Sequence, residues 1–251
     1  MLLKPPIGAQ LDRSHSFADD LVGAWLLNER GGIIAHDMSG HGNDCTGSVG
    51  WDAKGAVLDG TNDYLVGVWP QNAGLLTSGT ITFTVRRNFA ANVVKYIFDS
   101  EGSTRYLLWH RATGAWQLYL SGNGIANVPE DWIPNGETTT CAISFDDARS
   151  SDKQIYYKNG IQYYTTDTAH GGGLASILHI GQRFSYEGRW LGGIHSFGIY
   201  NRALTPNEIQ DLYIDPYAAF RAPARRIWVP TGAAATYIPA MMHHYHNTRV
   251  A

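Results

Sequence analysis

This sequence contains little charge, no long apolar run and only two cysteines, and each shortage excludes a class of protein. Asp, Glu, Lys and Arg make up 16% of the 251 residues, and the formal net charge is −3. Nucleic-acid binding requires clustered Lys and Arg, and the one such cluster, Arg221, Arg225 and Arg226, is typical of a protein contact. No stretch approaches the roughly 20 apolar residues of a membrane-spanning helix. We therefore expect neither a nucleic-acid partner nor a membrane partner.

Two further absences concern export and cross-linking. The N-terminal residues, MLLKPPIGAQLDRSHS, lack the apolar run of a signal peptide, so we expect any extracellular location to be reached by assembly or lysis. The two cysteines are Cys45 and Cys141. A chain of this length can bury a sizeable core without disulfide cross-links, so we expect two separate thiols, with a disulfide as the alternative.

Short strands separated by turns fill most of the chain. In TITFTVR, Ile81, Phe83 and Val85 alternate with threonines, and this period of two predicts a half-buried strand. Asn159-Gly160 predicts a type I′ hairpin. Twelve strands with no helical alternation predict an all-β sandwich or barrel. The expected strands are residues 21–27, 56–59, 63–68, 80–86, 94–98, 105–111, 115–120, 139–145, 153–158, 161–166, 177–181 and 191–201.

One short helix interrupts this pattern near the end of the strands. Thr205-Pro206-Asn207-Glu208 is a capping box with proline at the first helical position. Ile209, Leu212 and Tyr213 then form an apolar stripe, and Asp215-Pro216 ends the helix. We expect this helix to close one edge of the sandwich.

The two ends of the chain differ in composition from its middle. Residues 1–20 read as an extended arm because Pro5-Pro6 forbids helix. Residues 21–214 form the strand-rich domain. Residues 215–251 carry prolines and no strand periodicity, yet they are too aromatic for a disordered linker. We expect this tail to dock on its own domain or on a neighbouring subunit, as in a homo-oligomer. Its aromatic residues include Phe220, Trp228, Tyr237 and Tyr245.

Two distant stretches carry a family resemblance. Residues 21–66 contain LVGAWLLNERGG, DMSGHGNDCTG and VLDGTNDYLV, and residues 190–213 read WLGGIHSFGIYNRALTPNEIQDLY. These motifs resemble the laminin G-like (LamG) group of the concanavalin A-like lectin/glucanase superfamily over roughly residues 21–213. The resemblance implies a jelly-roll β-sandwich in which the first and last strands lie side by side. It says less about function, because this fold hosts lectins, enzymes and structural modules.

The arms carry a second resemblance. PPIGAQLDRSHSFADDLVGAW and RRIWVP look like reading frames of bacteriophage genomes that contain such a domain. This likeness implies a virion surface protein, such as a capsid decoration or fibre component, whose terminal arms bind a capsid protein or further copies of the chain.

The family resemblance also implies a structural Ca²⁺. The candidate ligands are Glu29, Asp37, Asn43 and Asp63, which place hard oxygen atoms in glycine-rich loops. The chain departs from the family pattern at His195, where the pattern has Asp, and a neutral imidazole is a poor Ca²⁺ ligand. The alternative is that Asp37 and Asp63 cap turns through their own backbone.

Carbohydrate binding needs an aromatic face beside fixed amides or carboxylates. Trp69 and Asn72 lie in one loop-like segment, and Asp131 and Trp132 lie in another, so we expect these two tryptophans to be the exposed ones. Most of the eight tryptophans are expected to pack in the core. The remaining candidate rings are Trp109, Trp116 and Trp190.

Catalytic motifs are missing from the sequence. Retaining glucanases of this superfamily place two Glu on one strand, whereas no two of the six Glu here lie within six residues of each other. Asp146-Asp147 reads as a solvated turn, and the tail cluster His243, His244 and His246 reads as a packing feature. We therefore expect a non-enzymatic binding and assembly module. The alternatives are a glycoside hydrolase or polysaccharide lyase on the same fold, and a free soluble lectin.

Overall fold

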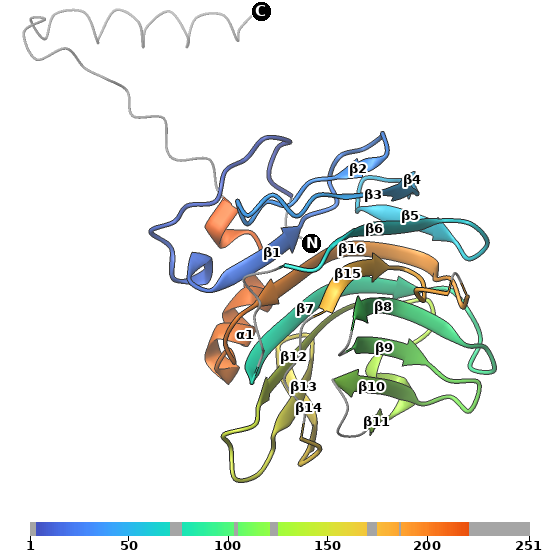
Figure 1. The fold of residues 1–251 in the computed structure, drawn as a ribbon, viewed down its shortest axis with the longest axis vertical. Helices are drawn as coiled ribbons and strands as arrows, with labels where there is room; N and C mark the ends of the chain where they lie inside the picture. Colours follow the sequence, from blue (N-terminus) through green and yellow to red (C-terminus); the bar gives the residue numbers. More distant parts are fainter. Residues whose placement is uncertain are drawn as a thin grey trace, which may run out of the picture. The chain divides into compact units, whose positions relative to one another are not determined.

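Two antiparallel sheets of eight strands each face one another in the computed structural model, which describes residues 4–70, 77–102, 105–120, 125–169, 175–185 and 187–220 (Figure 1). The first sheet runs β14 (Ile161–Thr166), β13 (Gln154–Lys158), β12 (Thr138–Asp146), β7 (Ser78–Arg87), β16 (Leu191–Tyr200), β5 (Ala56–Asp59) and β4 (Gly50–Trp51), and β1 (Leu21–Trp25) also pairs with β16. The second sheet runs β11 (Ile125–Val128), β10 (Trp116–Leu120), β9 (Tyr106–His110), β8 (Lys95–Gly102), β15 (Ala175–Ile180), β6 (Tyr64–Val68), β3 (Cys45–Ser48) and β2 (Ile34–Ala35).

The core lies between the sheets and follows the alternation of the strands. In β7, Ile81, Phe83 and Val85 are buried on the inner face, whereas Thr82 and Thr84 point outward and are partly exposed. The expected two-layer sandwich is therefore confirmed. Its end strands meet as the resemblance implied, because β1 pairs antiparallel with β16, with Leu21 opposite Tyr200 and Trp25 opposite Phe197.

Local turn and cap chemistry behaves as the sequence predicts. Asn159 and Gly160 have φ values of 51° and 78°, and they join β13 to β14 with Lys158 opposite Ile161. Helix α1 (Pro206–Ile214) begins with a complete capping box between Thr205 and Glu208. The strands that sequence patterns miss are β2, β3, β4 and β11, which are too short to show an alternation.

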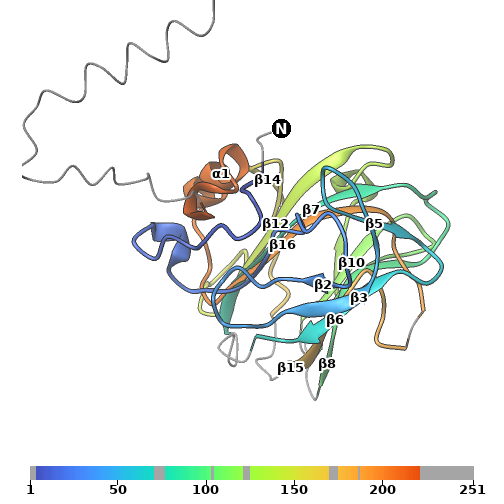
Figure 2. The same ribbon diagram turned by 90° about the horizontal axis from the view of Figure 1, so that it is seen from above.

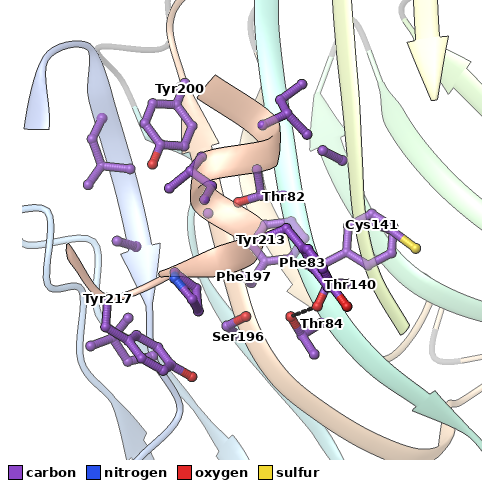
Figure 3. A pocket seen from close by; sticks show the side chains of 18 of the residues that line it. Thr82, Phe83, Thr84, Thr140, Cys141, Ser196, Phe197, Tyr200, Tyr213 and Tyr217 are labelled. Carbon is purple, nitrogen blue, oxygen red and sulfur yellow. Dashed lines mark hydrogen bonds between the residues drawn. The ribbon is translucent and has the colours of Figure 1, made fainter. Parts of the chain in front are cut away.

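Helix α1 covers a face of the first sheet and does not close the sandwich edge, so that expectation is wrong. Its Ile209 packs with Ala142 of β12 and Tyr200 of β16 in a second apolar cluster outside the main core. Figure 2 shows α1 beside β12, β14 and β16, away from β6 and β15. The apolar stripe of the helix is thereby covered, because an amphipathic helix buries its apolar side against another layer. A cavity of about 70 Å³ remains beneath the helix (Figure 3).

The described parts of both arms pack against the domain itself. The Asp12 N–H donates to the carbonyl of Ala219 at 2.7 Å, and Phe17 and Phe220 belong to the cluster beneath α1. Two short 3₁₀ turns, η1 (Ser16–Ala18) and η4 (Ala218–Phe220), shape these segments. The expectations for Trp228, Tyr237 and the tail histidines lie outside the described residues.

Two further expectations can be compared with the described residues. Cys45 and Cys141 are both buried and carry free thiols, so the expectation of separate thiols is confirmed. Burial raises the pKa of both thiols, which keeps them protonated. No helix among the described residues is long and apolar enough to span a membrane.

Candidate functional site

The Asp37 carboxylate, a predicted calcium ligand, is occupied by hydrogen bonds from its own loop and from β1. Its Oδ1 accepts from the backbone N–H groups of Ala24 and Ser39, both at 2.9 Å. Its Oδ2 accepts from the Ser39 hydroxyl at 2.8 Å and from the backbone and side-chain N–H groups of Asn43, both at 3.0 Å. A carboxylate has about four lone-pair sites. These donors therefore leave no site on Asp37 for a cation.

The other predicted ligands serve separate turns. Glu29 Oε1 accepts from the His36 N–H at 2.9 Å, and Asp63 Oδ2 accepts from the Asp59 N–H at 3.0 Å in the turn between β5 and β6. Within the described segments, no three His, Cys, Asp or Glu side chains are placed to hold one metal ion. The Glu29, Asp37 and Asp63 carboxylates are therefore not gathered around one point. The turn-capping alternative describes Asp37 and Asp63.

The expected exposure of two loop tryptophans is wrong. Trp69 is 2% exposed and stacks on Tyr106 with ring centroids 4.9 Å apart. Trp132 is 0% exposed, and its Nε1 donates to the carbonyl of Tyr157 at 3.0 Å. Both indoles belong to the main core cluster, because a large indole gains more from burial than from solvent contact. Asp131 is exposed and accepts a hydrogen bond from the Tyr163 hydroxyl. Asn72 lies outside the described residues.

A strand tryptophan takes the exposed position instead. Trp109 of β9 is partly exposed, whereas its neighbours Leu108 and His110 are buried in the interior. Strand alternation turns Trp109 to the outer side of the second sheet. The register places it opposite Tyr96 of β8 and Gln117 of β10. We call this outer surface of β8 to β11 the Trp109 face, and it comprises Tyr96, Asp99, Leu107, Trp109, Gln117, Tyr119 and Asn127.

On the Trp109 face, Trp109 and Tyr119 are partly exposed and Asn127 is exposed, whereas Tyr96 and Gln117 are buried behind them. The rings of Tyr96 and Trp109 stack with centroids 6.3 Å apart and planes inclined by 24°. On the next two strands, Gln117 Nε2 donates to Asn127 Oδ1 at 2.6 Å. Tyr119 is partly exposed and lies opposite Leu107. Such an amide pair holds its remaining donors and acceptors in fixed directions, which suits the hydroxyls of a ligand.

A buried ion pair forms one margin of the Trp109 face. Asp99 is 0% exposed and is held by Arg105, whose Nε donates to Oδ1 at 2.6 Å and whose Nη2 donates to Oδ2. The Phe184 N–H also donates to Asp99 Oδ2 at 2.9 Å, and its ring lies 4.5 Å from the Arg105 guanidinium carbon. This bidentate pair fixes the loop after β15 against the sheet.

A second buried polar group adjoins this pair. His179 of β15 lies opposite Asp99, and its Nε2 lies 3.8 Å from Glu101 Oε2. Its Nδ1 lies 3.3 Å from Gln182 Nε2, and Gln182 Oε1 is buried without a hydrogen-bond partner among the described residues. Burial lowers the pKa of His179, whereas the Asp99 and Glu101 carboxylates oppose that shift. The imidazole is therefore neutral at pH 7.

The comparisons with known families agree with this architecture. A laminin G family model, described as the concanavalin A-like lectin/glucanases superfamily, matches residues 52–210, which is more than half of the chain. The chain belongs to this superfamily. A comparison with curated protein sequences gave no match.

Solved structures with the same fold include two kinds of protein. This laminin G-like domain matches a Trypanosoma rangeli sialidase in complex with sialic acid with a TM-score of 0.60 and 15% identity, over 80% of this chain and 33% of that chain. It matches the receptor binding domain of botulinum neurotoxin D with a TM-score of 0.63 and 13% identity, over 81% of this chain and 54% of that chain. The domain thus spans 33% to 54% of the length of these proteins, and such low identities establish the fold alone.

The cavity beneath α1 does not compete with the Trp109 face as a sugar site. Its volume of about 70 Å³ is far below the roughly 300 Å³ at which small-molecule pockets begin. Its walls include Thr82, Thr84 and Thr140, and the hydroxyls of Thr84 and Thr140 lie 3.1 Å apart (Figure 3). The Trp109 face, in contrast, combines a partly exposed indole with a hydrogen-bonded amide pair.

Proposed function

We propose that this domain is a non-enzymatic carbohydrate-binding module whose Trp109 face holds the glycan. The observation that carries the proposal is the partial exposure of Trp109 between the Tyr96 ring and the Gln117–Asn127 amide pair. An apolar sugar face stacks on an indole, while fixed amides hydrogen-bond the hydroxyls. The solved structures of similar fold support the proposal of carbohydrate binding, because they include a sialidase bound to sialic acid and toxin receptor-binding domains.

A glycan array probed with the full chain tests the proposal. We expect binding to at least one class of glycan, and we expect Trp109→Ala to abolish it. Trp51→Ala is the matched control, because Trp51 is also partly exposed but belongs to the first sheet. An array without hits, or equal loss of binding in both variants, would contradict the assignment of the Trp109 face.

A polysaccharide lyase or hydrolase is the second candidate. It is favoured by one observation, the placement of Asp99, Glu101 and His179 on the same side of β8 and β15. A neutral imidazole near a carboxylate can move a proton, although Asp99 is already paired with Arg105. Release of reducing ends from a β-glucan, or of unsaturated products from a uronate polymer, would favour this candidate. Glu101→Gln and His179→Gln would then abolish turnover without abolishing glycan binding.

Placement of this module on a virion surface rests on the arm sequences alone and stays a prediction. Residues 4–20 pack on the domain itself, and deleting them would remove Phe17 and Leu11 from an apolar cluster. That deletion would therefore destabilise the domain whether or not the arm binds a partner. Deletion of residues 222–251 is the cleaner test, because residues 1–221 form one compact unit. Loss of particle or oligomer assembly with retained glycan binding would support an assembly role. Unchanged assembly would favour a free lectin.

A further inference from the structure

Three backbone carbonyls converge on the side chain of Lys4. Its Nζ donates to the carbonyl oxygens of Leu26 at 2.5 Å, Leu27 at 3.0 Å and His195 at 2.5 Å. An ammonium group has three N–H donors, and here each has an acceptor. Lys4 belongs to the N-terminal arm, whereas its acceptors follow β1 or lie in β16. One side chain therefore joins three parts of the fold.

The backbone around Lys4 is shaped so that these carbonyls are available. Along one edge of β16, β5 pairs with residues up to Ile194, whereas β1 pairs from Phe197 onward. His195 lies in the gap between them, and the register with β7 is irregular between Ile194 and Ser196. Leu27 has a φ of 52°, which turns the chain sharply after β1. The carbonyls of Leu26, Leu27 and His195 are consequently not paired with any neighbouring strand that the structure describes, and they accept from Lys4 in the gap between β1 and β5.

We call the three carbonyl oxygens around the Lys4 ammonium the Lys4 cage, and two carboxylates act on it electrostatically. Burial lowers the pKa of Lys4 to about 8, and the negative charges of Glu29 and Asp52 oppose that shift. The ammonium therefore stays charged at pH 7. A cluster of carbonyl oxygens with nearby carboxylates is the environment in which a hard divalent cation binds. At the same place, the family pattern has an acidic residue where this chain has His195.

We propose that the Lys4 ammonium is this chain's internal substitute for a structural divalent cation at the gap between β1 and β5. The substitution explains why the predicted calcium ligands do not gather, and why a poor Ca²⁺ ligand is tolerated at position 195. It also gives the N-terminal arm a structural role. The arm carries the Lys4 ammonium, and Asn28 Nδ2 holds the arm in place by donating to the carbonyl of Pro5 at 2.8 Å.

Thermal unfolding of the full chain in millimolar CaCl₂ and in EDTA tests the proposal. We expect the wild type to melt at the same temperature in both solutions. Lys4→Met should melt lower by at least about 5 °C, because it removes three charge-assisted hydrogen bonds. Lys54→Met is the matched control, since Lys54 is exposed and close in sequence to Asp52. A wild type stabilised by Ca²⁺, or a Lys4→Met variant as stable as the control, would overturn the proposal.

A double variant tests whether the ammonium occupies a divalent-cation position. Lys4→Ala/His195→Asp removes the internal cation and restores the acidic residue of the family pattern. We expect Ca²⁺, and not Na⁺ at equal ionic strength, to raise its melting temperature. A folded double variant that melts at the same temperature in both salts would refute the substitution.

A measurement on the unaltered protein covers the case in which the double variant does not fold. Acetylation of the native chain by an amine-reactive ester, followed by mass spectrometry, compares Lys4 with Lys54. We expect Lys4 to react at least about tenfold more slowly, because its partly buried nitrogen donates to three carbonyls, and this shielding outweighs the larger share of free amine that a pKa of about 8 gives it. Equal labelling of both lysines would rule out the cage.

Discussion

Tyr96 and Trp109 stack on each other across β8 and β9, with ring centroids 6.3 Å apart. Tyr96 is 7% exposed and supports the partly exposed Trp109 ring, which is therefore the apolar platform on the outside of the second sheet. The platform lies next to the Gln117–Asn127 amide pair, which is held by a hydrogen bond of 2.6 Å. The adjacent Asp99–Arg105 pair fixes the loop that contains Phe184 beside this platform.

The platform predicts a graded response to changes at Trp109. We expect Trp109→Ala to weaken glycan binding by about 30-fold or more, which corresponds to roughly 2 kcal/mol of lost stacking. Trp109→Phe should keep part of the affinity because a smaller ring remains. Isothermal titration with an array-selected glycan measures both values. Equal affinities for the two variants would show that ring stacking at this position does not contribute.

The hydrogen bonds of Asp37 predict a large stability cost for its replacement. Asp37→Asn places an amide N–H₂ among backbone and side-chain donors, so at least one buried donor loses its acceptor. We expect the free energy of unfolding to fall by about 3 kcal/mol in a denaturant titration. The exposed Asp211→Asn is the control and should change it by less than about 0.5 kcal/mol. A calcium-dependent rescue of Asp37→Asn would contradict its role as a turn cap.

Burial of His195 predicts a loss of stability at mildly acidic pH. The ring is 2% exposed, and burial lowers its pKa from 6.5 to about 4, with Lys4, Lys54 and Arg86 acting in the same direction and Asp52 against it. Between pH 6.5 and 4 the unfolded chain takes up a proton that the folded chain does not. This group therefore lowers the free energy of unfolding by up to about 3 kcal/mol as the pH falls through that window.

Urea titrations of the wild type and of His195→Gln at pH 7 and pH 4 measure this effect. Carboxylates titrate in both proteins, so the informative quantity is the difference between the two pH dependences. We expect the variant to lose less stability on acidification than the wild type. Parallel pH profiles would show that His195 does not carry the predicted proton linkage.

The hairpin between β13 and β14 predicts a steric effect at Gly160. Its φ is +78°, and a Cβ added there would lie 2.9 Å from the Cβ of Tyr213 on α1. We expect Gly160→Ala to lower the free energy of unfolding by about 2 to 3 kcal/mol, from backbone strain and this contact together. Gly136→Ala isolates the strain, because Gly136 has a φ of +81° and nothing within 4 Å of the added atom. Equal losses of unfolding free energy in the two variants would show that α1 moves aside from the added Cβ without destabilising the fold.

Much of the fold could be predicted from residues that act on their near neighbours. The alternation in β7, the Asn159-Gly160 turn and the Thr205–Glu208 capping box each involve atoms a few positions apart. The family motifs added the pairing of β1 with β16, which no local pattern contains. The short strands β2, β3, β4 and β11 could not be predicted, because two to four residues are too few to show a period.

The candidate site depended on the tertiary structure. Trp69 and Trp132 lie outside the named strands but point into the core, whereas Trp109 lies in a strand and faces outward. No sequence pattern distinguishes them, since exposure is set by the layer that packs on each ring. The partners of Lys4 lie 22, 23 and 191 residues away. The sequence determined the sandwich because backbone preferences and strand periodicity act locally. Only the tertiary structure decided which ring meets solvent and which cation fills the gap, because distant segments make those contacts.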